Sequence, residues 1–153
     1  MGPAFRAGHS VEAFFHEEPA FFVVSPPASK AWDRRIGVDI ERREPAIPVD
    51  IADDILAPQE SKSIRCAMDP VAAFFDHWTL KEAYLKACGT GLTRPPSEIV
   101  VSPNQAQRYD GFFLQRLDLN PQWSAALAVE CHDWEAPPAV LLHRRPSLAA
   151  ASG

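Results

Sequence analysis

The sequence predicts an α+β fold in which an antiparallel sheet packs on one long helix. One segment, residues 70–88, carries helix signals at both ends. The other apolar segments are short and are separated by proline, asparagine and glycine, which is typical of antiparallel strands. With 153 residues, 46% of them hydrophobic, the chain suits one domain over residues 1–153. We expect residues 1–20 and 146–153 to be its least ordered parts.

The helix predicted over residues 70–88 begins and ends at recognisable residues. Asp69 can accept hydrogen bonds from the first backbone N–H groups, and Pro70 suits the first helical position. Gly89 can take the left-handed conformation that ends a helix. We therefore expect one uninterrupted helix between these residues.

The face that this helix buries follows from a turn of about 100° per residue. The apolar stripe consists of Val71, Phe74, Phe75, Trp78 and Leu85. Glu82 falls inside the stripe, and Lys81 and Lys86 flank it. A carboxylate aimed at the core needs a cation or hydrogen-bond donors to remain charged. An ordinary pair between Glu82 and Lys86, one helical turn apart on an exposed edge, is the simpler alternative.

The remaining elements are short, and one strand carries acidic residues. Strands are expected at residues 11–15, 20–24, 35–41, 99–101, 112–117, 124–131 and 139–143, with a short helix within residues 49–56. In the strand at 35–41, Asp39 and Glu41 share one face, because side chains alternate along a strand. That face could simply be solvated. Combined with Glu82 and its two lysines, however, the pair predicts a site for Mg²⁺ and a phosphate group.

Composition excludes several classes of protein. The net charge of −5 argues against binding to nucleic acid or to an anionic membrane. Three widely spaced cysteines argue against a disulfide framework or a zinc site, and we expect buried thiols in a reducing compartment. No apolar run approaches the ~20 residues of a membrane span. These features predict a soluble, cytoplasmic protein.

Two segments resemble the signature motifs of one enzyme family. The segment from Arg35 to Glu41 reads R-I-G-V-D-I-E, and that from Trp78 to Lys86 reads W-T-L-K-E-A-Y-L-K. Together with the following G-T-G-L at residues 89–92, they resemble the 4′-phosphopantetheinyl transferase superfamily, whose motifs are G-(V/I)-D-x-E and W-(S/T/C)-x-K-E-(A/S)-x-x-K. The resemblance implies a single lobe of that fold, with holo-acyl-carrier-protein synthase activity. Such an enzyme moves phosphopantetheine from coenzyme A to a carrier-protein serine, with Mg²⁺, and releases 3′,5′-ADP.

The resemblance also implies roles for individual residues. Asp39, Glu41 and Glu82 would bind Mg²⁺, and Glu82 would act as general base. Lys81 and Lys86 would contact the phosphates of coenzyme A. Family members that act on peptide and polyketide synthases have an upstream histidine that contacts a coenzyme A phosphate; we expect His16 in that place, with His9 as the alternative.

The length of the chain affects the expected assembly. Synthase-activating members with this signature have two lobes in one chain, whereas small members form trimers. The resemblance therefore implies either a homo-oligomer, with a trimer favoured, or a domain of a larger synthase such as an iterative polyketide synthase. The carrier would belong to fatty acid, polyketide or peptide synthesis. The alternatives are a non-catalytic lobe that binds carrier protein and another Mg²⁺-dependent phosphoryl enzyme.

Overall fold

The computed structural model describes residues 11–15, 20–25, 34–46, 50–89, 93–132 and 138–144, which fall into two compact units. One unit contains β1 (Val11–Phe15), β2 (Ala20–Ser25) and β7 (Ala139–Arg144). They form an antiparallel sheet in the order β1-β2-β7. β1 has the predicted bounds, and β2 and β7 each extend one residue further. The single domain expected over the whole chain stays a prediction.

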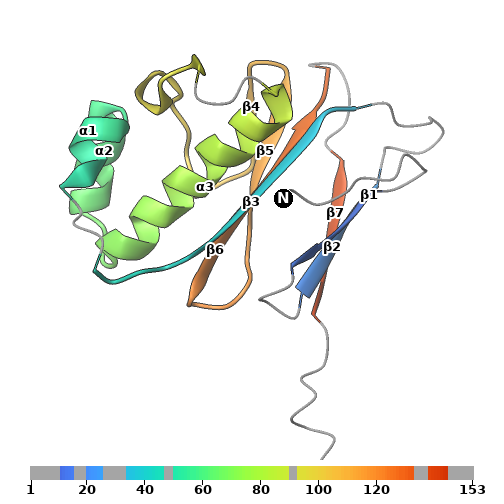
Figure 1. Ribbon diagram of the computed structural model, residues 1–153, viewed down its shortest axis with the longest axis horizontal. Helices are drawn as coiled ribbons and strands as arrows, with labels where there is room; N and C mark the ends of the chain where they lie inside the picture. The colour runs from blue at the N-terminus through green and yellow to red at the C-terminus, as the bar shows by residue number, and fades with distance from the viewer. Residues whose placement is uncertain are drawn as a thin grey trace, which may run out of the picture. The chain divides into compact units, whose positions relative to one another are not determined.

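The second unit contains a four-stranded antiparallel sheet and the helices (Figure 1). Its strands are β3 (Ile36–Arg42), β4 (Gln107–Tyr109), β5 (Phe112–Leu117) and β6 (Trp123–Glu130). Their order is β3-β6-β5-β4, so β3 lies at one edge among the described strands. β5 matches the prediction, β3 and β6 are shifted by one residue, and β4 was not predicted. The α+β fold is confirmed.

Helix α3 (Pro70–Cys88) has the predicted bounds and packs on β3, β5 and β6. The Asp69 carboxylate accepts a hydrogen bond from the Ala72 backbone N–H at 3.0 Å, so the predicted N-cap is formed. Gly89 has φ 70°, in the left-handed region, and its N–H donates to the Leu85 carbonyl. The helix is therefore capped at both ends.

The single apolar stripe predicted for α3 is too narrow. Phe74, Phe75 and Leu85 are buried as expected, but α3 also buries residues on other sides, because α2 (Pro58–Arg65) packs against it. The short helix α1 (Ile51–Ile55) joins α2 and the first half of α3 in an apolar cluster. The buried members of this cluster are Ala52, Leu56, Ile64, Phe74 and Phe75. α1 lies within the predicted segment, whereas α2 was not predicted.

The strand predicted at residues 99–101 is wrong. These residues follow a 3-10 turn, η2 (Pro96–Glu98), and belong to no described sheet. Ile99 and Val101 are buried in the core cluster that lies between α3 and the sheet. The Val101 N–H donates to the Glu60 carboxylate at 2.8 Å. A side-chain acceptor therefore takes the place of a neighbouring strand.

Two further expectations concern cysteines and membranes. None of the three cysteines is in a disulfide, but Cys66 is exposed, contrary to the expectation of buried thiols, whereas Cys131 is buried. Within the described ranges, no helix is both long enough and apolar enough to cross a bilayer.

Gly37 brings β3 and α3 into backbone contact. A Cβ atom placed on Gly37 would lie 2.0 Å from the Ala83 carbonyl oxygen and 2.5 Å from the Ala87 backbone nitrogen. Real Cβ atoms do not approach backbone atoms so closely. The glycine of the G-V-D-x-E segment is therefore required by packing.

We expect Gly37→Ala to lower the free energy of unfolding by about 3 kcal/mol, because the helix or the strand must move to admit the methyl group. Gly89→Ala is the matched control: nothing lies within 4 Å of its added Cβ, so only the left-handed conformation opposes the change, at about 1 kcal/mol. Urea unfolding measures both. A Gly37→Ala protein as stable as Gly89→Ala would contradict the close approach.

Candidate functional site

β3 presents two carboxylates to α3. Gly37 faces α3, and side chains two and four residues further along a strand lie on the same face, so Asp39 and Glu41 also lie on this side. Asp39 is only 5% exposed, and Glu41 is half-buried. Val38 and Ile40 lie on the opposite face of the sheet. The predicted sharing of one face by Asp39 and Glu41 is thus present in the structure.

Lys86 on the last turn of α3 forms an ion pair with Asp39. Its Nζ donates a hydrogen bond to Asp39 Oδ1 at 2.6 Å. The second oxygen, Oδ2, is buried and has no hydrogen-bond partner. Burial raises the pKa of Asp39 above its ordinary value, and the hydrogen bond from Lys86 opposes that rise. Asp39 is therefore only partly compensated.

Glu82, one turn before Lys86, belongs to the same cluster. Burial raises the pKa of Glu82, and the negative charge of Asp39 raises it further. The pKa of Glu41 is raised by burial, then by Asp39, and also by Glu82. The structure thus brings together Asp39, Glu41 and Glu82, which we call the acidic cluster, with Lys86 beside it.

The acidic cluster fits a hard divalent cation in charge and in donor type. Three carboxylates share one lysine as their neighbouring cation, and one buried carboxylate oxygen is unpartnered. Mg²⁺ is commonly held by carboxylates together with water and substrate phosphate oxygens. In the described part of the chain, no three acidic, histidine or cysteine side chains already converge as a metal-binding group. Side chains of the cluster would therefore have to move to hold the ion.

Lys81, the second lysine predicted to contact phosphate, lies away from the acidic cluster. Its side chain is fully buried, and its Nζ pairs with Glu60 and donates to the carbonyls of Pro96 at 2.7 Å and Ile99 at 2.6 Å. Burial lowers the pKa of Lys81, and Glu60 opposes that shift. Three acceptors use all three ammonium hydrogens, so none is left for a phosphate. The structure therefore does not bring Lys81 to the acidic cluster, because α2 and residues 96–101 cover this side of α3.

Glu60 is the structural residue that the sequence analysis missed. Its two carboxylate oxygens accept from the backbone N–H groups of Ala57 and Val101, and it also pairs with Lys81. The pair consequently joins α2, α3 and residues 96–101. A glutamate at the third position of a helix that begins with proline is typical of a helix N-terminus, so the sequence contained a signal for α2 and for the role of Glu60 there. Its partner Lys81, 21 residues away, could not be inferred from local spacing.

Asp76 attaches the first half of α3 to the sheet. Its carboxylate accepts from the Ser124 hydroxyl at 2.5 Å, from Arg43 at 3.1 Å and from Arg116 at 3.2 Å. These partners belong to β6, to the residue after β3 and to β5, respectively. The helix that carries Glu82 and Lys86 is therefore attached to the sheet in its first half as well. The predicted phosphate ligand His16 and its alternative His9 lie outside the described residues.

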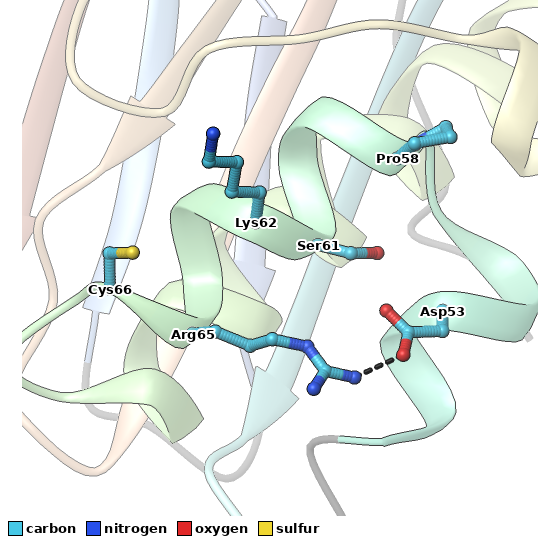
Figure 2. Close-up of a pocket in the computed structure, with 6 residues that line it drawn as sticks. All are labelled: Asp53, Pro58, Ser61, Lys62, Arg65 and Cys66. Atoms are coloured by element: carbon cyan, nitrogen blue, oxygen red, sulfur yellow. Dashed lines mark hydrogen bonds and ion pairs between the residues drawn. The ribbon is translucent and has the colours of Figure 1, made fainter.

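The described cavities lie apart from the acidic cluster. Figure 2 shows one of about 470 Å³ beside α1 and α2, where Arg65 points toward Asp53 and forms an ion pair with it. Its lining residues are Asp53, Pro58, Ser61, Lys62, Arg65 and Cys66. A second, of about 480 Å³, lies beside Arg42 and Asp69. Neither is lined by a predicted site residue, so the candidate site is the acidic cluster with Lys86.

Comparison with known proteins gives consistent matches. The family model of the 4′-phosphopantetheinyl transferase superfamily matches residues 35–137. The 4′-phosphopantetheinyl transferase HetI of Nostoc sp. is 30% identical over 119 residues, which cover 68% of this chain and 47% of that protein. The L-aminoadipate-semialdehyde dehydrogenase-phosphopantetheinyl transferase of Schizosaccharomyces pombe is 41% identical over 71 residues, covering 44% and 28%. The chain spans less than half the length of these relatives.

A solved structure shares the fold. The holo-(acyl-carrier-protein) synthase of Thermotoga maritima superposes with a TM-score of 0.52 over 63% of each chain. The sequence identity is 22%, so this likeness concerns the fold alone.

We expect Lys81→Met to lower the free energy of unfolding by about 3–5 kcal/mol, because Glu60 would be left as a buried charge without its cation. The double variant Lys81→Met, Glu60→Gln should recover part of that loss, since no charge then remains buried. Lys62→Met, at an exposed position of α2, should change stability by less than about 0.5 kcal/mol.

Urea unfolding of the three variants checks this ion pair. If Lys81→Met unfolds like the unaltered chain and binds coenzyme A more weakly, Lys81 is a phosphate ligand after all.

Proposed function

The chain belongs to the 4′-phosphopantetheinyl transferase superfamily, and we propose that it transfers phosphopantetheine from coenzyme A to a serine of an acyl or peptidyl carrier protein. One observation carries the proposal. The acidic cluster and Lys86 come from the two segments that resemble the family's motifs, and they meet although β3 and α3 are separated by 27 residues of sequence. Asp39 and Lys86 are in direct contact.

The acidic cluster is the proposed Mg²⁺ site, with Asp39, Glu41 and Glu82 as ligands. The unpartnered Asp39 Oδ2 and the mutual repulsion of the three carboxylates support this assignment. Bound there, the ion would supply positive charge to the phosphate oxygens and to the leaving group. Among the described residues, Lys86 lies beside the acidic cluster and is placed to add a second cation beside a phosphate. Lys81 is not carried into the proposed site.

The proposed reaction is a displacement at the β-phosphorus of coenzyme A. The serine oxygen of the carrier forms a bond to this phosphorus while the bond to 3′,5′-ADP breaks, and 3′,5′-ADP leaves with the electron pair. Glu82 accepts the proton of the serine hydroxyl, because it is a half-buried carboxylate beside both Asp39 and Lys86. The Lys86 ammonium neutralises phosphate charge as it develops.

The proposed activity also requires assembly. The aligned segments cover 47% of HetI and 28% of the Schizosaccharomyces pombe relative, and the coenzyme A pocket proposed here would take residues from a second source. We infer that this source is another copy of the chain, with a trimer favoured, or a partner domain of a synthase.

The experiment that tests the activity is incubation with fluorescent coenzyme A, Mg²⁺ and a panel of apo carrier proteins from fatty acid, polyketide and peptide synthesis. We expect label on carrier protein, and a loss of at least about 100-fold for Asp39→Ala, because charge stabilisation of this kind contributes several kcal/mol. The thermal midpoint should change little, because Lys86, whose side chain is 51% exposed, can turn to solvent.

Asp54→Ala is the matched control, since it removes an exposed carboxylate from α1. If Asp39→Ala labels carrier protein as well as Asp54→Ala does, Asp39 is not part of the active site. Release of phosphate from simple esters without carrier labelling would indicate a different phosphoryl enzyme.

Dilution tests the proposed assembly. If the coenzyme A pocket is completed by a second subunit, activity per chain should fall as the protein is diluted, and coenzyme A should promote association by mass action. Light scattering with and without coenzyme A, run beside the labelling assay, measures both effects. A monomer whose specific activity is independent of concentration would show that one copy is sufficient.

A further inference from the structure

We propose that Lys86 acts as an internal counter-ion that occupies Asp39 before the metal binds and leaves it when the cation arrives. This inference rests on the proposed function, because it assumes that the acidic cluster holds Mg²⁺. The contact that carries it joins Lys86 Nζ and Asp39 Oδ1 at 2.6 Å. Lys86 would thus form two successive ion pairs, first with the Asp39 carboxylate and then with a phosphate.

The two carboxylate oxygens of Asp39 differ. The difference favours replacement of the Lys86 ammonium by the cation over simultaneous binding of both. Oδ2 is buried without a partner, so a cation arriving from solvent cannot reach it before the site rearranges. Oδ1 is the oxygen on the side of the half-exposed lysine, and it already carries the ammonium group. A cation and an ammonium that compete for one oxygen repel each other strongly at contact distance. The incoming ion would therefore displace Lys86.

Lys86 is free to move, whereas Lys81 is not. The side chain of Lys86 is 51% exposed, and among the described residues it donates a hydrogen bond to one carboxylate oxygen. The side chain of Lys81 has no exposed surface and satisfies three acceptors. The two lysines lie five residues apart on one helix, and only Lys86 is placed to change its partner. The ammonium group of Lys81 can therefore serve as an internal reference when that of Lys86 is observed.

Release of Lys86 would couple the two ligands of the site. In the metal-free protein the ammonium is engaged with Asp39 and is not available to a phosphate. Once displaced, it remains on the last turn of α3, one turn from Glu82, where a phosphate bound at the cation would meet it. Coenzyme A should therefore bind more tightly after Mg²⁺ than before it.

The direct test is a Mg²⁺ titration of the full chain, without coenzyme A, observed by ¹⁵N NMR of the lysine ammonium groups, with calorimetry in parallel. Lys86→Arg assigns the Lys86 resonance by its loss. We expect that resonance to shift or disappear as Mg²⁺ saturates the site, while the Lys81 resonance stays unchanged. An unchanged Lys86 resonance while calorimetry records a bound Mg²⁺ would overturn the exchange, and so would the absence of Mg²⁺ binding.

A pair of variants provides a second measurement. Lys86→Gln removes the competing ammonium and should tighten Mg²⁺ binding without coenzyme A by roughly tenfold, the effect expected for losing one close like charge. Lys62→Gln makes the same change of net charge at an exposed position of α2 and should leave the affinity unchanged. Equal affinities in the two variants would contradict the proposal. Neither measurement uses coenzyme A or carrier protein, so failure of the exchange is distinguishable from failure of the transferase activity.

Discussion

The backbone contact between β3 and α3 at Gly37 is the constraint on which the rest of the site depends. Because no side chain separates Gly37 from Ala83 and Ala87, the strand and the helix approach more closely than ordinary packing allows. Asp39 lies two residues along the strand, and Lys86 is the neighbour of Ala87 on the helix. Their contact at 2.6 Å is thus a consequence of a missing methyl group nearby. A larger residue at position 37 would move Asp39 away from Lys86.

The second feature on which the site depends is the different environment of two lysines in one motif. Lys81 is enclosed and joins α3 to α2 and to residues 96–101 through Glu60 and two carbonyl groups. Burying such a pair contributes little net stability, but removing one partner is expensive, so it mainly specifies one arrangement of these elements. Lys86 is half-exposed and pairs with Asp39. A motif that looks uniform in sequence therefore combines an enclosed ammonium group and a half-exposed one.

What the sequence could predict depended on whether the decisive interactions were local. The ends of α3 followed from Asp69 and Gly89, because capping is decided within a few residues. The shared face of Asp39 and Glu41 followed from strand alternation in the same way. The placement of Lys81 did not follow, because its neighbours come from 15 to 21 residues away. A helical wheel shows which residues share a side of a helix, but it cannot show that α2 covers that side.

The position of β3 at the edge of its sheet has a consequence for solubility. Among the described strands of its sheet, β3 pairs with β6 alone, and an edge strand with unpaired N–H and C=O groups is a template for aggregation. Natural proteins protect such edges with charged side chains that make further pairing unfavourable. β3 carries Asp39, Glu41 and Arg42 along this edge. The charged residues of β3 would thus also oppose the pairing of this edge with the same strand of another copy of the chain.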